Sequence, residues 1–155
     1  MRAHSTFWCG TFLSLLLTVP GRAEPSLPAP DSDRDGLPDP AKWDYDTERN
    51  RLGWYNNELQ YYADRRPENA RVENGRLVIT ARQERLSSAP DFGGQNYTSA
   101  RLITQGLASW TYGHFEVRAK LPCGLGTWPA IWMLPQEAGA GWPSRTRMRV
   151  MGDLL

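Results

Sequence analysis

Two tryptophans in one short apolar segment are the residues of this chain best placed to do chemistry. Trp128 and Trp132 both lie in residues 126–134, which read GTWPAIWML. If the segment is a strand, the two indoles share one face and lie roughly 13 Å apart, because a strand rises about 3.3 Å per residue. An indole is flat and apolar with one polar edge, which suits the flat C–H faces of successive pyranose rings. The alternative is that both rings are buried in a core.

The elements that must position these rings are predicted to be strands. Residues 114–121 alternate between apolar and charged side chains, as a half-buried antiparallel strand does. Asn74-Gly75 is a strong two-residue turn signal, and it predicts a hairpin between strands over 70–73 and 76–82. Aromatic and β-branched runs predict two further strands, over 54–62 and 99–104. Since no stretch sustains a 3.6-residue period and no repeat occurs, the predicted fold class is an all-β sandwich or jelly roll.

The N-terminal segment predicts a secretory signal peptide over residues 1–23. Arg2 is followed by a mostly apolar run over 7–17, and Gly21 and Ala23 are spaced like a signal-peptidase site. The alternative, a membrane-spanning helix, would need roughly 20 apolar residues. We therefore expect a secreted protein, extracellular or periplasmic, that has no membrane contact after cleavage.

Charge and cysteine content exclude several classes of partner. Loss of Arg2 and Arg22 with the leader changes the net charge from +1 to −1, which does not indicate a nucleic-acid binder. Cys123 is then the single cysteine and His114 the single histidine, so no internal disulfide and no zinc or haem ligand set is expected. We expect a monomer that requires no cofactor.

An acidic, proline-rich segment over residues 24–40 is predicted to be a linker that leads into a domain over 41–155. Its spaced aspartates imitate a calcium loop, but Lys42 stands where an EF-hand has its bidentate glutamate, and Pro38 and Pro40 exclude the flanking helix. A solvated acidic turn is the preferred interpretation.

Several ordered segments resemble family 16 glycoside hydrolases of the laminarinase (endo-β-1,3-glucanase) branch, and together they cover roughly residues 43–143. The matching segments are GWYNNELQYY (53–62), PENARVENGRLVI (67–79), YTSARL (97–102), YGHFEVRAKLP (112–122), GTWPAIWML (126–134) and GWP (141–143). The resemblance implies a jelly-roll β-sandwich of the concanavalin A-like type, here incomplete on its C-terminal side, with a sugar-binding cleft across one sheet. It also implies a β-glucan substrate of the laminarin type, although mixed-linkage glucan and β-galactan hydrolases share the scaffold. Family members often carry a structural calcium ion away from the cleft, so calcium binding stays open.

The resemblance also implies which residues face the cleft. They are Asn56, Asn57, Arg101, Trp128, Trp132 and Trp142. Asparagine and arginine would donate hydrogen bonds to sugar hydroxyls, and the tryptophans would provide stacking faces. The alternatives are that the two asparagines are turn residues and that Arg101 forms a surface ion pair.

The family's catalytic motif is present in register but without its acids. In the family, Gly-Trp-Pro is followed three residues later by Glu-x-Asp-x-x-Glu: the nucleophile, a supporting acid and the acid/base. The outer two share a strand face only if one residue bulges out. Here these positions are Arg147, Arg149 and Gly152, with Val150-Met151 as the spacer. No other glutamate forms a suitable pair, so this chain is predicted to have no catalytic residues.

Three losses in one six-residue motif, directly before Leu155, favour a truncated or mis-read gene over evolved inactivity. Resequencing that finds an intact Glu-x-Asp-x-x-Glu frame would support this hypothesis, and a clean stop would contradict it. Two alternatives stay open. The chain could be a non-catalytic β-glucan-binding protein, or it could fail to fold because a sandwich that lacks strands exposes open edges.

Overall fold

The computed structural model describes residues 12–15, 35–136 and 148–153. These residues form strands and one short 3-10 turn. In chain order they are β1 (Phe12–Leu15), β2 (Asp44–Tyr45), the turn η1 (Tyr55–Asn57), β3 (Gln60–Tyr62), β4 (Ala70–Glu73), β5 (Arg76–Ile79), β6 (Tyr97–Ser99), β7 (Arg101–Ile103), β8 (Val117–Lys120), β9 (Ala130–Pro135) and β10 (Met148–Asp153).

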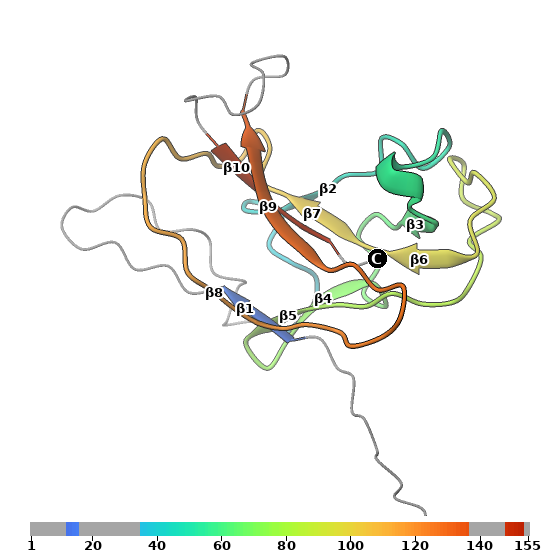
Figure 1. Cartoon of the computed structure of the whole chain (residues 1–155), viewed down its shortest axis with the longest axis horizontal. Helices are drawn as coiled ribbons and strands as arrows, with labels where there is room; N and C mark the ends of the chain where they lie inside the picture. Colours follow the sequence, from blue (N-terminus) through green and yellow to red (C-terminus); the bar gives the residue numbers. More distant parts are fainter. Residues whose placement is uncertain (1–11, 16–34, 137–147, 154–155) are drawn as a thin grey trace, which may run out of the picture.

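The strands form two four-stranded sheets and a small two-stranded one (Figure 1). One four-stranded sheet has the order β4-β5-β1-β8 and the other has the order β2-β7-β10-β9. Within both, every pairing is antiparallel, whereas β3 and β6 pair in parallel. The predicted all-β sandwich is confirmed.

The hydrophobic core lies between the two larger sheets. Leu77 and Ile79 from β5 meet Tyr45 from β2 and Leu102 from β7, with Trp110 in the same cluster. Three partly buried residues pack against this cluster: Phe115 from the segment before β8, Val117 from β8 and Met133 from β9. Each sheet thus buries one face against the other, which is how a sandwich hides its apolar side chains.

The predicted hairpin is confirmed. β4 and β5 pair from Ala70 with Ile79 to Glu73 with Arg76. Asn74 and Gly75 have φ angles of 52° and 70°, the two positive values that a type I′ turn requires.

Other strand predictions need correction. The run over 54–62 is not one strand, because Asn56 and Asn57 adopt left-handed φ angles of 56° and 60° and form a turn before β3. Asparagine tolerates that conformation better than most residues. The run over 99–104 is likewise divided, because Ser99 ends β6 and Ala100 separates it from β7.

The strand predicted over 114–121 is shorter and less buried than its pattern indicated. It begins at Val117, and both Ala119 and Leu121 are exposed although they belong to the apolar set. Alternation predicts which side chains share a face but not whether a second layer covers that face.

The segment expected to be a linker contacts the domain. The backbone N–H and C=O of Gly36 bond to Val72, and the Asp35 carboxylate accepts a hydrogen bond from the Asn74 N–H at 2.9 Å. Residues 12–15, within the expected leader, form β1. None of the described residues belongs to a helix long and apolar enough to span a membrane.

Candidate functional site

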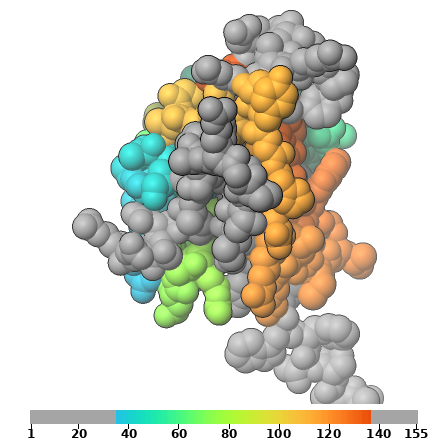
Figure 2. Space-filling view, turned by 90° about the vertical axis from the view of Figure 1, so that its left-hand side faces the viewer, coloured from blue at the N-terminus to red at the C-terminus, as the bar shows by residue number. Residues whose placement is uncertain are grey.

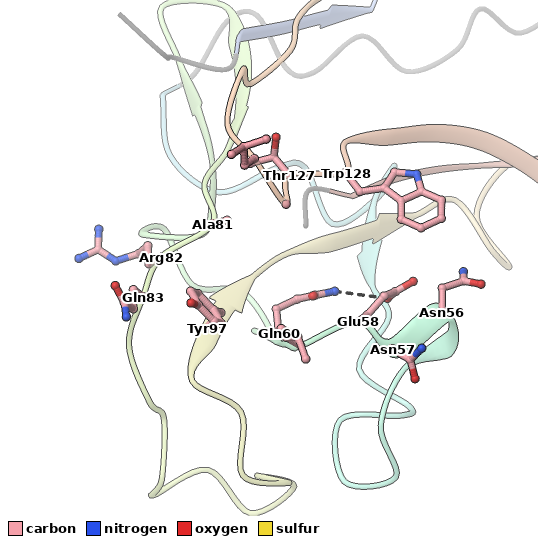
Figure 3. A pocket seen from close by; sticks show the side chains of 13 residues that line it. Asn56, Asn57, Glu58, Gln60, Ala81, Arg82, Gln83, Tyr97, Thr127 and Trp128 are labelled. Atoms are coloured by element: carbon pink, nitrogen blue, oxygen red, sulfur yellow. Dashed lines mark hydrogen bonds between the residues drawn. The ribbon is translucent and has the colours of Figure 1, made fainter. Parts of the chain in front are cut away.

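A pocket of about 500 Å³ lies where the turn η1, the strands β3 and β6 and the loop before β9 meet (Figure 3). Its lining residues are Asn56, Asn57, Glu58, Leu59, Gln60, Ala81, Arg82, Gln83, Tyr97, Leu125, Gly126, Thr127 and Trp128. One carboxylate and one guanidinium are the only formal charges among them, so the wall is close to neutral. A neutral ligand that combines apolar faces with hydrogen-bonding groups fits such a wall.

Aromatic rings stand at both ends of the pocket. Trp128 lies beside Asn56 and Glu58 at one end, and Tyr97 lies near Gln83 and Arg82 at the other (Figure 3). Trp128 is 56% exposed and Tyr97 is 41% exposed. Each ring therefore offers an open face to a ligand.

Asn56 and Asn57 line the pocket from the turn η1. Both are exposed, and a free carboxamide can both donate and accept hydrogen bonds. The turn role and the binding role are therefore compatible, because the left-handed backbone presents both residues at the pocket wall.

Glu58 forms a buried part of the pocket wall that the sequence did not indicate. Its side chain is 8% exposed, and it accepts hydrogen bonds from Gln60 Nε2 and Tyr62 Oη, each at 3.3 Å. The sequence does not reveal this role, because Glu58 follows the turn η1 while both partners lie in β3, and the turn and the strand were predicted as one run.

Arg101 pairs with Glu58 of the pocket wall and is 4% exposed. Its Nη1 is 3.7 Å from Glu58 Oε2, and its Nε is 3.3 Å from Asp46 Oδ2. The guanidinium carbon also lies 4.9 Å, 5.7 Å and 5.2 Å from the ring centroids of Trp54, Tyr62 and Trp132 respectively. The ion pair that sequence analysis left open exists, but it is buried. Contact of Arg101 with a sugar stays a prediction.

Asn50 connects this cluster to the surrounding loops. Its fully buried carboxamide donates to Tyr62 O at 2.9 Å and to Asp91 Oδ2 at 2.8 Å. It accepts from the Tyr62 N–H at 2.9 Å and from Trp54 Nε1 at 3.0 Å. One buried side chain thus forms hydrogen bonds with four polar groups of three residues.

The Asp91 carboxylate, which lies outside the pocket lining, also binds the side chain of Tyr61 in β3. Tyr61 Oη donates to Asp91 Oδ1 at 2.6 Å. Burial raises the pKa of Tyr61, and the carboxylate that accepts its proton raises it further. Tyr61 therefore keeps its proton throughout the physiological range and acts as a donor.

The two tryptophans of residues 126–134 have different environments. Trp128 precedes β9 and lines the pocket. Trp132 lies within β9, is half-buried and contacts Arg101. Its Nε1 has no hydrogen-bond partner among the described residues. The shared-face prediction assumed that both belong to one strand, which the structure does not show for Trp128.

The catalytic motif falls on β10. Arg149 pairs with Leu134, and Gly152 pairs with Ile131 of β9. Six consecutive pairs join the strands from Met148 to Asp153, so no bulge interrupts the ladder within these residues. Positions 149 and 152 therefore fall on opposite faces. Trp142 and Arg147 lie outside the described residues.

No group of three or more acidic, histidine or cysteine residues in the described ranges could hold a metal ion. Asp35, the nearest described remnant of the calcium-like segment, directs its carboxylate to the backbone of the hairpin.

Comparison with known proteins gives a consistent group of relatives. No protein-family profile matches the chain. A beta-glucanase of Rhodothermus marinus is 55% identical over 122 residues, which are 77% of this chain and 40% of that protein. A glucan endo-1,3-beta-glucosidase of Cryptopygus antarcticus is 47% identical over 105 residues, covering 66% and 36%.

A solved structure and a more distant relative extend the comparison. The crystal structure of a non-specific endo-beta-1,3(4)-glucanase of family GH16 with a bound oligosaccharide superposes with a TM-score of 0.73 at 53% identity. It covers 88% of this chain and 52% of that one. A beta-1,3-glucan-binding protein of Penaeus monodon is 47% identical over 55 residues, covering 35% and 15%.

The chain spans about half the length, or less, of the relatives that it matches. The identities nevertheless agree with the fold. This chain belongs to glycoside hydrolase family 16 and is similar to the laminarinase branch, of which it represents the N-terminal part.

Proposed function

We propose that this chain binds β-1,3-glucan in the pocket between η1, β6 and the loop before β9, and that it does not hydrolyse the glucan. The observation that carries the proposal is the pocket's wall. An exposed indole, two free carboxamides and an exposed phenol line a nearly neutral hollow. Such a wall offers both stacking faces and hydrogen bonds to an uncharged, hydroxyl-rich ligand.

The relatives support this ligand class. Those named above are a beta-glucanase, an endo-1,3-beta-glucosidase, an endo-beta-1,3(4)-glucanase and a beta-1,3-glucan-binding protein. The last name describes binding alone, and it supports the proposal that the scaffold can serve without catalysis. The β-1,3 linkage is the one that most of these names share.

The absence of hydrolysis follows from the chemistry of the motif. A retaining glycosidase needs two carboxyl groups roughly 5 Å apart. An arginine stays protonated and cannot form a glycosyl ester or accept a proton at neutral pH, and glycine has no functional group. Within β10, Asp153 is the single acidic residue, and one carboxylate cannot act as both nucleophile and acid/base.

The site of action is part of the same proposal. A polymeric β-glucan lies outside the cell that takes it up or degrades it. The leader pattern over residues 1–23 supports secretion of this chain.

A pull-down on insoluble β-1,3-glucan tests the proposal. Wild-type protein should be retained, and Trp128→Ala should weaken binding. An exposed half of an indole, about 100 Å² at about 25 cal/mol/Å², contributes about 2.5 kcal/mol, or roughly 70-fold in Kd. Tyr112→Ala is the matched control, because Tyr112 is 87% exposed and does not line the pocket. Equal retention of both variants, or no retention of the wild type, would contradict the proposal.

A further inference from the structure

A second pocket of about 490 Å³ adjoins the first pocket, the one that contains Trp128. Its lining residues are Gln83, Glu84, Arg85, Asn96 and Tyr97. Gln83 and Tyr97 line both pockets, and Figure 3 places them at the end of the first pocket opposite Trp128. Because the two walls share these residues, one extended ligand can enter both pockets.

The wall of the second pocket is polar apart from the ring of Tyr97. Gln83 and Asn96 are both exposed. Within the described residues, neither carboxamide has a hydrogen-bond partner. Each can therefore donate two hydrogen bonds to a ligand without breaking an existing contact.

The one carboxylate of this wall, that of Glu84, is already neutralised from behind. Its Oε1 lies 2.5 Å from Arg66 Nη1 and 3.2 Å from Arg82 Nε, and it accepts a hydrogen bond from Thr98 Oγ1 at 2.6 Å. Its Oε2 accepts a second hydrogen bond from Arg66 at 3.2 Å. Two guanidiniums thus surround the acid, and its charge does not dominate the pocket.

Arg85 carries the positive charge that remains. It is exposed, and its guanidinium carbon lies 5.7 Å from the centroid of the Phe92 ring. None of the carboxylates in the described ranges forms an ion pair with it. Around the pocket the guanidiniums of Arg66, Arg82 and Arg85 therefore outnumber the carboxylates of Glu84 and of Glu68, which pairs with Arg66 at 3.5 Å.

The two pockets thus differ in the chemistry that they offer. The wall of the first is nearly neutral and aromatic. The second presents a guanidinium without an acidic partner beside two free carboxamides. A guanidinium binds planar or tetrahedral oxyanions through two parallel N–H groups, and a stacked ring limits its motion.

We propose that the second pocket binds an anionic substituent, a carboxylate or a sulfate ester, on the part of a β-glucan that extends past Tyr97. Arg85 pairs with the anion, and Gln83 and Asn96 donate hydrogen bonds to the same sugar residue. The inference rests on the proposed function, because the first pocket holds the neutral part of the same chain.

Isothermal titration calorimetry with three ligands tests this inference. They are a neutral β-1,3-gluco-oligosaccharide, the same oligosaccharide oxidised to carboxylates at C6, and the same oligosaccharide sulfated at C6. The wild type should bind an anionic form about fivefold more tightly than the neutral form, which corresponds to about 1 kcal/mol. High salt should reduce this ratio, since an exposed charge pair is screened.

Two variants decide whether the preference is local. Arg85→Gln should bring the ratio of affinities close to one. Arg118→Gln is the matched control, because Arg118 is also exposed and has no ion pair among the described residues. It lies in β8, which forms part of the exposed orange column in Figure 2 and is remote from β3 and β6 in Figure 1. Its variant should keep the wild-type ratio.

The outcomes separate this inference from the proposed function. A preference for only one anionic form supports the inference and identifies the substituent. Equal affinity of the wild type for all three ligands would overturn it, as would a preference that survives in Arg85→Gln or that falls equally in Arg118→Gln. Failure of the neutral ligand to bind, with an Arg85-dependent affinity for the anionic ones, would contradict the proposed function and leave this inference standing.

Discussion

The buried Arg101 cluster makes the sharpest prediction for a single substitution. Arg101→Met keeps a long unbranched side chain but removes the positive charge that faces Glu58 and Asp46. Glu58 is 8% exposed, so its carboxylate cannot recover full hydration after the change. Breaking one side of a buried pair costs about 3–5 kcal/mol. We therefore expect Arg101→Met to lower the free energy of unfolding by about that amount.

A matched control separates burial from charge. Arg71 also pairs with a glutamate, Glu73, at 2.9 Å, but the two side chains are 36% and 46% exposed. Arg71→Met should cost less than about 1 kcal/mol, because exposed ion pairs contribute little. Arg101→Lys should lower the free energy of unfolding by more than Arg71→Met does and by less than Arg101→Met does. It keeps the charge but loses the planar group that contacts the rings of Trp54, Tyr62 and Trp132.

Equilibrium urea unfolding, followed by far-UV circular dichroism, gives the free energies. A further readout is glucan retention, which Arg101→Met should weaken because the cluster supports both Glu58 and Trp132. If Arg101→Met destabilises the protein no more than Arg71→Met does, the buried cluster does not stabilise the site and the reasoning is refuted.

Three further predictions concern stability. Hydrogen bonds from Arg66 and Thr98 lower the pKa of Glu84 from 4.5 to about 2. The contribution of Glu84 to the free energy of unfolding is therefore complete above pH 4.5 and is lost as the pH falls toward 2. Glu84→Gln should flatten this pH dependence of unfolding in acid, and an unchanged slope would contradict the assignment. Asn50→Ala removes the hydrogen bonds that the buried carboxamide makes with the Tyr62 N–H and C=O, and should cost about 3 kcal/mol or more in urea unfolding. Gly93→Ala places a Cβ 2.5 Å from the Asn50 carbonyl oxygen and should lower the melting temperature, at a cost of about 1–3 kcal/mol. Wild-type stability of Asn50→Ala, or a wild-type melting temperature of Gly93→Ala, would contradict the corresponding prediction.

Local patterns in the sequence predicted some of the fold correctly. The Asn74-Gly75 turn is read directly from two residues whose backbone preferences fix the hairpin. The alternation around Val117 located β8, but it could not show that Ala119 and Leu121 lie uncovered. Coverage depends on which other segment packs there, and that is a property of the whole chain.

The site illustrates the same limit. Asn56, Asn57 and Trp128 were expected at a cleft, and all three line the pocket. Glu58 and Tyr97 also line it. They were missed because the pocket joins segments that are far apart in the sequence, and no local period reports such proximity. The pairing of β1 with β5 was likewise invisible, since an apolar leader and an apolar strand have similar patterns.

The most direct test of the central claim is one titration with a reducing-end-labelled β-1,3-gluco-oligosaccharide, read by fluorescence anisotropy and then by mass spectrometry. We expect saturable binding that Trp128→Ala weakens, with every oligosaccharide recovered at its original length after prolonged incubation. Shortened products that appear with the wild-type chain, or an absence of binding by folded protein, would contradict it.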